Sequence, residues 1–237
     1  MTKTKILVIQ SELRKLADKT RAQHSQRFFK TAEGEYGAGD LFLGIRVPEL
    51  RKFSRQYQSY SIEQVLNILT SEFHEERLLA LFMLIHHFDK ADQTTRKTIY
   101  KHYLNNIQYI NNWDLVDSSA PKIVGVYLYD KNRKPLYALA KANDLWSRRI
   151  AILSTLYFIN NKDYADTLKI SEMLLHDKED IIHKAVGWML REVGNQDFTV
   201  ERRFLDQHYK TMPRTMLRYA IEKFPSPLRH SYLKGEI

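Results

Sequence analysis

Three short segments of the sequence combine residue types that could carry out chemistry. They are Trp113-x-x-x-Asp117, the pair Arg148-Arg149, and Trp188. Tryptophan faces attract cations, and a carboxylate beside them could stabilise positive charge developing on a sugar ring or orient an attacking water molecule. Arginine adds a planar fork that donates two parallel hydrogen bonds to a phosphate group. These residue types together favour chemistry on a nucleic acid.

Each segment also has a purely structural interpretation. Trp113 and Trp188 could be core residues, and the paired arginines could belong to a solvated charged face. If the segment after Asn112 is helical, Trp113 and Asp117 lie one turn apart on the same face. Pro121 must then end or kink that helix, and Asp117 could instead cap the helix that follows it. Residue type alone leaves both interpretations open.

Other kinds of chemistry find little support in the sequence. The chain has nine histidines, including His74 and the pair His86-His87, but no His-Glu-x-x-His spacing or comparable set of metal ligands. It has no Gly-x-Ser-x-Gly elbow, and without cysteine it has no thiol nucleophile or disulfide. We therefore predict neither a metal nor a cofactor.

The overall charge points to a polyanionic partner. The net charge is +9 and the sequence pI is near 9.5, which favours nucleic acid over other partners. Basic residues strongly outnumber acidic ones over residues 121–149. The acidic residues there are Asp130 and Asp144, and the basic ones are Lys122, Lys131, Arg133, Lys134, Lys141, Arg148 and Arg149. No apolar run approaches the length of a membrane span and no signal-peptide pattern is present, so we expect a cytoplasmic protein without membrane contact.

Apolar residues recur with helical spacing along most of the chain, and strand-like alternation is absent, which predicts an all-α fold. Amphipathic helices are expected over Ser61–Leu69, Glu75–Phe88, Ser147–Phe158, Ile181–Val193 and Thr215–Phe224. Asn143-Asp144 and Asp177 precede two of these segments as candidate caps.

Small residues inside the apolar helices indicate an internal repeat. Ala80, Ala120, Ala151, Gly187 and Ala220 have similar surroundings at steps of roughly 30 to 40 residues, and each would let the paired helix of its hairpin pack closely. This spacing predicts one domain over residues 1–237, a curved α-solenoid of HEAT-like repeats with a concave face that binds DNA. Asp117, Arg149 and Trp188 fall at neighbouring points of successive repeats, so they would line one surface.

One irregular stretch, residues 32–40, contains Gly34, Gly37 and Gly39 and leads into Leu41-Phe42-Leu43-Gly44-Ile45. Its glycines lack the spacing of a phosphate-binding loop. We interpret it as a connection that closes onto a short apolar segment, with Pro48 opening the next helix. Tyr36 lies in its middle and is a candidate contact residue.

Four segments together resemble the AlkD-like family of DNA alkylation repair glycosylases, which are built from HEAT-like repeats. They are Leu41–Ile45 with Pro48, Asn112–Asp117, Leu145–Leu153 and Lys184–Glu192. The resemblance runs from about residue 30 to residue 195. It implies a monofunctional enzyme of base excision repair that removes positively charged purines alkylated at N3 or N7 from double-stranded DNA.

The resemblance also implies the roles of individual residues. Asp117 matches the family's catalytic aspartate, Trp113 and Trp188 its aromatic walls, and Arg149 the arginine that contacts the DNA backbone. Tyr36 matches the pocket tyrosine. We further expect DNA contacts from the basic side chains Arg148, Lys184, Arg191 and Lys122.

A rival hypothesis is a non-catalytic repeat protein that binds damaged or branched DNA, or a protein partner, along the same face. The Trp-x-x-x-Asp pair distinguishes the two hypotheses, because a protein that only binds has no need of it. We expect a monomer in either case.

Overall fold

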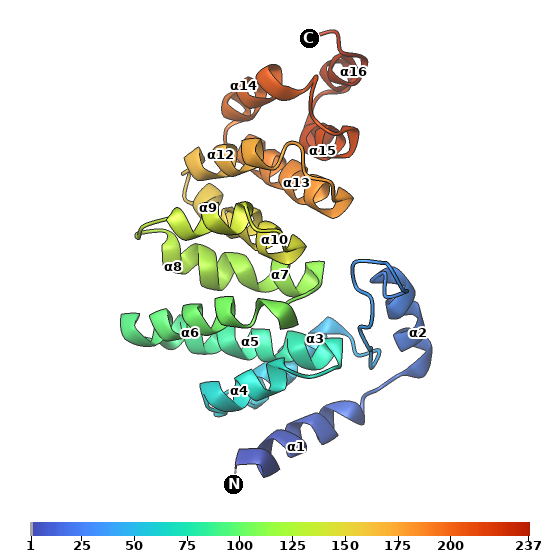
Figure 1. Cartoon of the computed structure of the whole chain (residues 1–237), viewed down its shortest axis with the longest axis vertical. Helices are drawn as coiled ribbons and strands as arrows, with labels where there is room; N and C mark the ends of the chain where they lie inside the picture. Colours follow the sequence, from blue (N-terminus) through green and yellow to red (C-terminus); the bar gives the residue numbers. More distant parts are fainter. Residues whose placement is uncertain (1) are drawn as a thin grey trace. The chain divides into compact units, whose positions relative to one another are not determined.

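The computed structural model describes the backbone of residues 2–237 and the side chains from Val8 onward (Figure 1). Met1, which the single-domain prediction includes, lies outside the described residues. In the described part every regular element is a helix, and the extended backbone is limited to one isolated bridge between Leu41 and Phe73. The all-α prediction is confirmed. None of the helices described is both long and apolar enough to cross a membrane.

The chain divides into two compact units, Met1–Ser119 and Ala120–Ile237. The prediction of a single domain, and that of a HEAT-like solenoid, stay predictions. The helices of the first unit, with the last residue of α7 passing into the second, are α1 (Thr2–Arg14), α2 (Lys19–Phe28), α3 (Val47–Gln56), α4 (Ile62–Leu69), α5 (His74–Lys90), α6 (Gln93–Asn105), η1 (Ile107–Tyr109) and α7 (Trp113–Ala120).

The second unit is likewise a succession of short helices. They are η2 (Pro121–Gly125), α8 (Val126–Leu128), α9 (Lys134–Ala140), α10 (Leu145–Ser154), α11 (Leu156–Asn160), α12 (Ala165–Met173), α13 (Asp180–Gln196), α14 (Phe198–His208), α15 (Arg214–Ala220), η3 (Ile221–Lys223) and α16 (Ser226–Lys234).

In the first unit, α5 is the central helix and packs against α3, α4 and α6. Its apolar run from Leu78 to Ile85 is buried on all sides, as expected for a helix covered by neighbours. The preceding α4 begins with a capping box, in which Ser61 and Gln64 satisfy each other's backbone N–H groups. The predictions of helices over 61–69 and 75–88 are confirmed, and Pro48 stands in the first turn of α3 as predicted.

In the second unit, α10 packs against α13, and α13 packs against α15. The helix predicted over 181–193 is confirmed. The one predicted over 147–158 begins earlier, at Leu145, and is interrupted at Thr155. The one predicted over 215–224 ends at Ala220 and continues as the 3-10 turn η3.

The candidate caps had different outcomes. Asp144 caps α10 by accepting a hydrogen bond from the Ser147 N–H at 2.6 Å, as predicted. Asp177 is not a cap, because α13 begins only at Asp180. Its carboxylate pairs instead with Arg148, with the Arg148 Nε atom 2.6 Å away.

The five small residues that indicated a repeat are buried, but the close contact at Gly187 differs from the expected one. A Cβ atom on Gly187 would lie 2.4 Å from the Met216 carbonyl oxygen and 2.6 Å from the Tyr219 Cβ. Both neighbours belong to α15, which is two helices further along the chain and is not the adjacent helix of a hairpin. In the second unit, this glycine therefore permits the close contact between α13 and α15.

Candidate functional site

Trp113 and Asp117 lie one helical turn apart on α7, as predicted, and both side chains are half-buried. Asn112 fixes the start of the helix, because its side-chain oxygen accepts a hydrogen bond from the Trp113 N–H at 2.9 Å. At the other end, α7 stops at Ala120 and the backbone continues as the wider π-helical turn η2. The α-helical hydrogen-bond pattern thus ends at Pro121, but the backbone continues as a helix.

The aromatic neighbours of Trp113 were not anticipated from the sequence. Phe29 stacks on its ring with centroids 5.2 Å apart and an interplanar angle of 16°. Phe28 meets it edge-on at 5.9 Å, and 58% of the Phe28 residue is exposed to solvent. The sequence signal that could have indicated them is the pair of adjacent phenylalanines at the end of the basic helix α2.

Tyr36 belongs to the glycine-containing loop, which folds back toward the start of α7. A Cβ atom on Gly37 would lie 2.5 Å from the Phe29 carbonyl oxygen and 3.0 Å from the Asn112 side-chain nitrogen. Only glycine fits at this close approach. The loop therefore places the half-buried Tyr36 next in sequence to a residue that packs against the cap of α7.

A buried polar network lies beneath this part of the first unit. The His74 ring donates from Nδ1 to Asp40 at 3.2 Å and from Nε2 to Asp114 at 2.9 Å. Arg77 donates to the other Asp40 oxygen at 2.6 Å, and Asn112 donates to the first at 3.3 Å. From the sequence His74 was a candidate only as a metal ligand, and this network could not be predicted because its members are spread over residues 40–114.

The charges of this network are set by mutual contacts. Burial acts to lower the pKa of His74, but the hydrogen bonds and charges of Asp114 and Asp40 outweigh it and raise that pKa to about 9. For Asp40, burial acts to raise the pKa, whereas the His74 hydrogen bond and the Arg77 charge together lower it. The two carboxylates thus favour the imidazolium form of His74.

In the second unit, Trp188 belongs to α13, and the side chain of Arg149 contacts this helix from α10. Arg149 is only 4% exposed, and its guanidinium donates to the Ile181 carbonyl oxygen at 2.6 Å. Ile181 and Trp188 are seven residues apart and hence on the same face of the helix. Trp188 is half-buried, and its Nε1–H donates to Glu192 at 2.8 Å.

The other basic residues predicted to bind DNA have distinct surroundings. Lys184 and Arg191 lie on the same face of α13 as Trp188. Lys184 pairs with Asp180 at 2.8 Å, and Arg191 pairs with Glu222. Lys122 is exposed on η2.

Arg148 has both a carboxylate partner and backbone partners. It pairs with Asp177 and donates to the carbonyl oxygens of Ala142 and Asn143. It thus fastens α10 to the segment before α13, and its contact with DNA stays a prediction.

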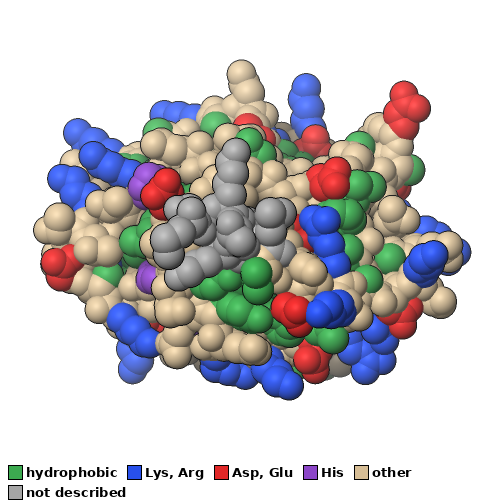
Figure 2. All heavy atoms as spheres, turned by 90° about the horizontal axis from the view of Figure 1, so that it is seen from below, with side chains coloured by type: hydrophobic (Ala, Val, Ile, Leu, Met, Phe, Trp, Pro, Cys, Tyr) green, Lys and Arg blue, Asp and Glu red, His purple; other side chains and the backbone are tan. Residues whose placement is uncertain are grey.

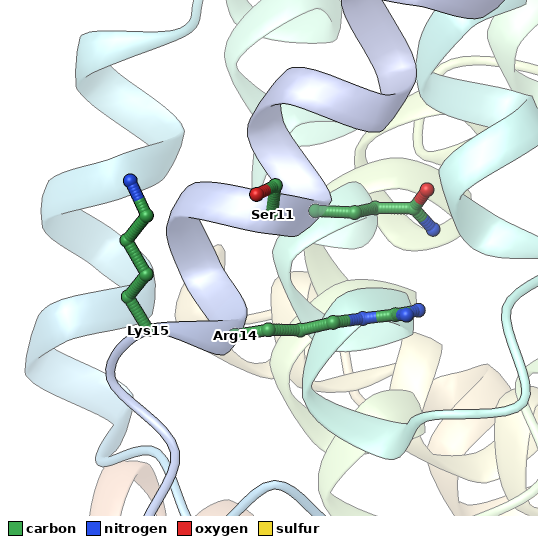
Figure 3. A pocket seen from close by; sticks show the side chains of 4 residues that line it. Ser11, Arg14 and Lys15 are labelled. Carbon is green, nitrogen blue, oxygen red and sulfur yellow. The ribbon is translucent and has the colours of Figure 1, made fainter.

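Two shallow pockets lie apart from these residues. One, of about 450 Å³, is lined by Gln10, Ser11 and Arg14 of α1 and by Lys15, which follows this helix (Figure 3). Gln10 and Arg14 both donate to Glu76 there, at 2.6 and 2.7 Å.

Figure 2 shows that Lys and Arg side chains on the face seen from below are interspersed with Asp and Glu and do not form one basic patch.

The other pocket, of about 350 Å³, is lined by residues 224–233 near the end of the chain. Across the described residues, no cluster of three or more potential metal ligands occurs.

Comparison with known proteins identifies the family of the chain. A family model described as DNA alkylation repair enzyme matches residues 9–224. Among solved structures, a predicted DNA alkylation repair enzyme from Enterococcus faecalis has a similar fold, with a TM-score of 0.68 and 16% sequence identity, covering 89% of this chain and 97% of that one. No curated protein matches by sequence. The family match spans most of the chain, which belongs to the DNA alkylation repair enzyme family.

Proposed function

We propose that the protein is a monofunctional DNA glycosylase that releases positively charged alkylated purines, alkylated at N3 or N7, from double-stranded DNA. Asp117 would stabilise the cation that develops on the sugar or position the attacking water. The observation that carries the proposal is the pair Trp113 and Asp117 on one face of α7 in a chain of this family. We further propose that it acts as a monomer in the cytoplasm.

Two structural tasks at the start of α7, its cap and its link to His74, fall to residues other than Asp117. Asn112 caps the helix and Asp114 accepts the hydrogen bond from His74. A cap after Pro121, the structural alternative for Asp117, is not required, because the backbone at Ala120 is helical with φ −57° and ψ −45°. Because the helical backbone runs on through this point, no new helix begins here, and there are no free N-terminal N–H groups that need a cap.

The proposed chemistry needs one carboxylate. A purine alkylated on a ring nitrogen carries positive charge and leaves as a neutral base, so no general acid has to protonate it. Tryptophan faces favour such a cation by roughly 0.5–2 kcal/mol, depending on its desolvation. Trp113 is kept in a fixed orientation by its stacking on Phe29, which suits a rigid aromatic wall. We propose the corresponding wall role for Trp188.

Phosphate contacts are proposed for Arg149 and for the basic side chains Arg148, Lys184, Arg191 and Lys122. Arg149 is only 4% exposed and its guanidinium donates to the Ile181 carbonyl oxygen, so the phosphate contact requires this side chain to become exposed when DNA binds. Phe28 is an additional candidate for contact with DNA, since it is exposed beside Trp113.

The proposal is tested by measuring base release from duplex DNA that contains N7-methylguanine. The wild-type protein should release the base, and Asp117→Asn should slow release by about 100-fold or more while its duplex affinity stays within a few-fold. Asp114→Asn is the matched control on the same helix. It should lower the melting temperature and leave release well above that of Asp117→Asn.

Two outcomes would contradict the proposal. Wild-type protein that binds the duplex without releasing the base would favour the non-catalytic alternative. Equal loss of binding, stability and release in Asp117→Asn would assign Asp117 to the fold. A duplex containing uracil, an uncharged lesion, should be left intact, and its efficient cleavage would contradict the charge-based mechanism.

A further inference from the structure

The start of α5 buries four consecutive ionisable residues, His74, Glu75, Glu76 and Arg77, all of them at most 4% exposed. Burial of charge is costly unless each group is paired. Glu75 accepts hydrogen bonds from the backbone N–H groups of residues 43–45, and Glu76 accepts from Arg14, Gln10 and Ser71. These two carboxylates therefore fasten neighbouring segments to α5. His74 and Arg77 point elsewhere, toward Asp40.

His74 has carboxylate partners on both ring nitrogens, Asp40 at Nδ1 and Asp114 at Nε2. Carboxylates only accept hydrogen bonds, so the ring must donate from both nitrogens and carry a positive charge. The charged groups that face it are Asp40 from the loop, Asp114 from α7 and Arg77 from its own helix. With 1% of its surface exposed, His74 cannot touch a substrate.

Two paths connect this buried cation to the candidate site. Asp114, its partner at Nε2, stands in the first turn of α7 between Trp113 and Asp117. The His74 ring also packs against Phe29, with centroids 5.0 Å apart, and Phe29 stacks in turn on Trp113. Phe42 covers the ring from another side at 4.5 Å. His74 thus contacts both the backbone element and the aromatic support that orient the Trp113–Asp117 face.

We propose that protonated His74 is a positioning residue for base release: it fixes the first turn of α7 and the Phe29–Trp113 stack, and thereby the direction in which Trp113 and Asp117 point. This inference rests on the proposed function. Loss of the proton leaves only one donor for two carboxylates, so one of the two links must open. Deprotonation or replacement of His74 should then disturb the rate of the chemical step more than the affinity for DNA.

The first measurement needs no variant and no substrate. In nitrogen NMR spectra of the 15N-histidine-labelled full-length protein, His74 should show both ring nitrogens protonated at pH 7.5 and titrate near pH 9. His86 is the internal reference on the same helix. Its Nε2 lies 3.1 Å from the Ser54 hydroxyl, and burial together with nearby positive charges lowers its pKa, so its ring should be neutral at pH 7.5. A neutral His74 ring at that pH would overturn the proposal.

The second measurement compares His74→Gln with the matched control His86→Gln. Under single-turnover conditions with saturating protein, His74→Gln should release N7-methylguanine about tenfold or more slowly, with duplex affinity within threefold of wild type. Its release rate should also lack the decline that the wild-type protein shows as the pH rises through about 9. His86→Gln should keep the wild-type rate and pH profile.

Asp114→Asn weakens the same link from the other side and provides a second test if His74→Gln does not fold. It should lower the single-turnover rate in the same way, to a lesser extent than Asp117→Asn. Wild-type rates in a folded His74→Gln or Asp114→Asn would overturn the positioning role alone. Absence of release from wild-type protein would instead contradict the proposed glycosylase function.

Discussion

Two carboxylates on α7, three residues apart, illustrate how neighbouring residues of one kind take different tasks. Asp114 accepts a hydrogen bond from buried His74, whereas Asp117 lies on the Trp113 face of the helix. Before the fold is known, either aspartate could be taken as the functional one, because both lie within the same turn as a tryptophan. The burial of His74 separates them, since a buried imidazolium requires its acceptor and thereby commits Asp114 to the fold.

Phe28 and Phe29 allow a direct test of the aromatic surroundings of Trp113. Phe28→Ala should leave the melting temperature nearly unchanged, because the side chain is mostly exposed, and should weaken base release and duplex binding. Phe29→Ala should instead lower stability by about 2–4 kcal/mol, since Phe29 stacks between His74, Phe42 and Trp113. The two variants are compared by thermal unfolding and by base release. Loss of stability in Phe28→Ala, with unchanged release, would contradict this division.

Glu201 on α14 predicts a pH-dependent change in stability. The residue is buried over Gly194, and within the described part of the chain its Oε1 has no hydrogen-bond partner. Burial, helped by Glu192 and opposed by Arg191, raises its pKa to about 8. The folded protein therefore retains a proton that the unfolded chain loses near pH 4.3, so the carboxyl group lowers stability progressively between about pH 4.3 and pH 8.

Glu201→Gln removes this titration, and its melting temperature should exceed that of the wild type by a margin that widens from pH 5 to pH 8. The exposed Glu33→Gln is the control and should show no such trend. His74 also loses stabilising charge at alkaline pH, but it is present in both proteins and cancels in the comparison. A difference that does not change with pH would contradict the assignment to Glu201.

At the scale of the elements, the most informative contact is the close approach of α13 and α15 at Gly187. Gly187→Ala should destabilise the protein by about 1–3 kcal/mol, because the new Cβ would lie 2.4 Å from the Met216 carbonyl. The Met216 carbonyl is backbone and cannot move aside easily. Gln196→Ala, at the exposed end of the same helix, should stay within about 0.5 kcal/mol. Equal stability of both variants in urea unfolding would refute the role assigned to Gly187.

Helix positions could be predicted from the sequence because local signals determine them. Ser61 and Gln64 form a capping box next to a helical apolar pattern, so both the start and the face of α4 are encoded within a few residues. The interruption at Thr155 carries no such local signal. Asp177 resembles a cap in the sequence, but pairing with Arg148, which is 29 residues away, determines its position instead.

Some features of the candidate site could likewise be predicted from the sequence, and others could not. Trp113 and Asp117 were found because their spacing of four lies within one helix. The Asp40–His74–Asp114 network and the Phe29–Trp113 stack join residues separated by 34 to 84 positions. Such partners are set by tertiary packing, and no local pattern in a single sequence marks them.

For the molecule as a whole, the net charge of +9 is the property that bears most on DNA binding. Each phosphate contact releases condensed counterions, so the logarithm of the affinity should fall linearly with the logarithm of the salt concentration. Lys122→Ala should flatten this slope by about 0.9, the value expected for one lost contact, because Lys122 is exposed on η2 in the basic stretch 121–149. Its melting temperature should not change.

Arg148→Ala is the informative companion to Lys122→Ala. In the wild-type protein the Arg148 guanidinium is held by Asp177 and two carbonyl oxygens. Its loss should therefore lower the melting temperature, and it should change the slope of affinity against salt by less than Lys122→Ala does. The slope is measured by fluorescence anisotropy with an undamaged duplex between 50 and 200 mM salt, about the range over which such contacts are most evident. Affinity that does not depend on salt would refute the electrostatic account. A larger slope change in Arg148→Ala than in Lys122→Ala would show that Arg148 exchanges its carboxylate partner for phosphate when DNA binds.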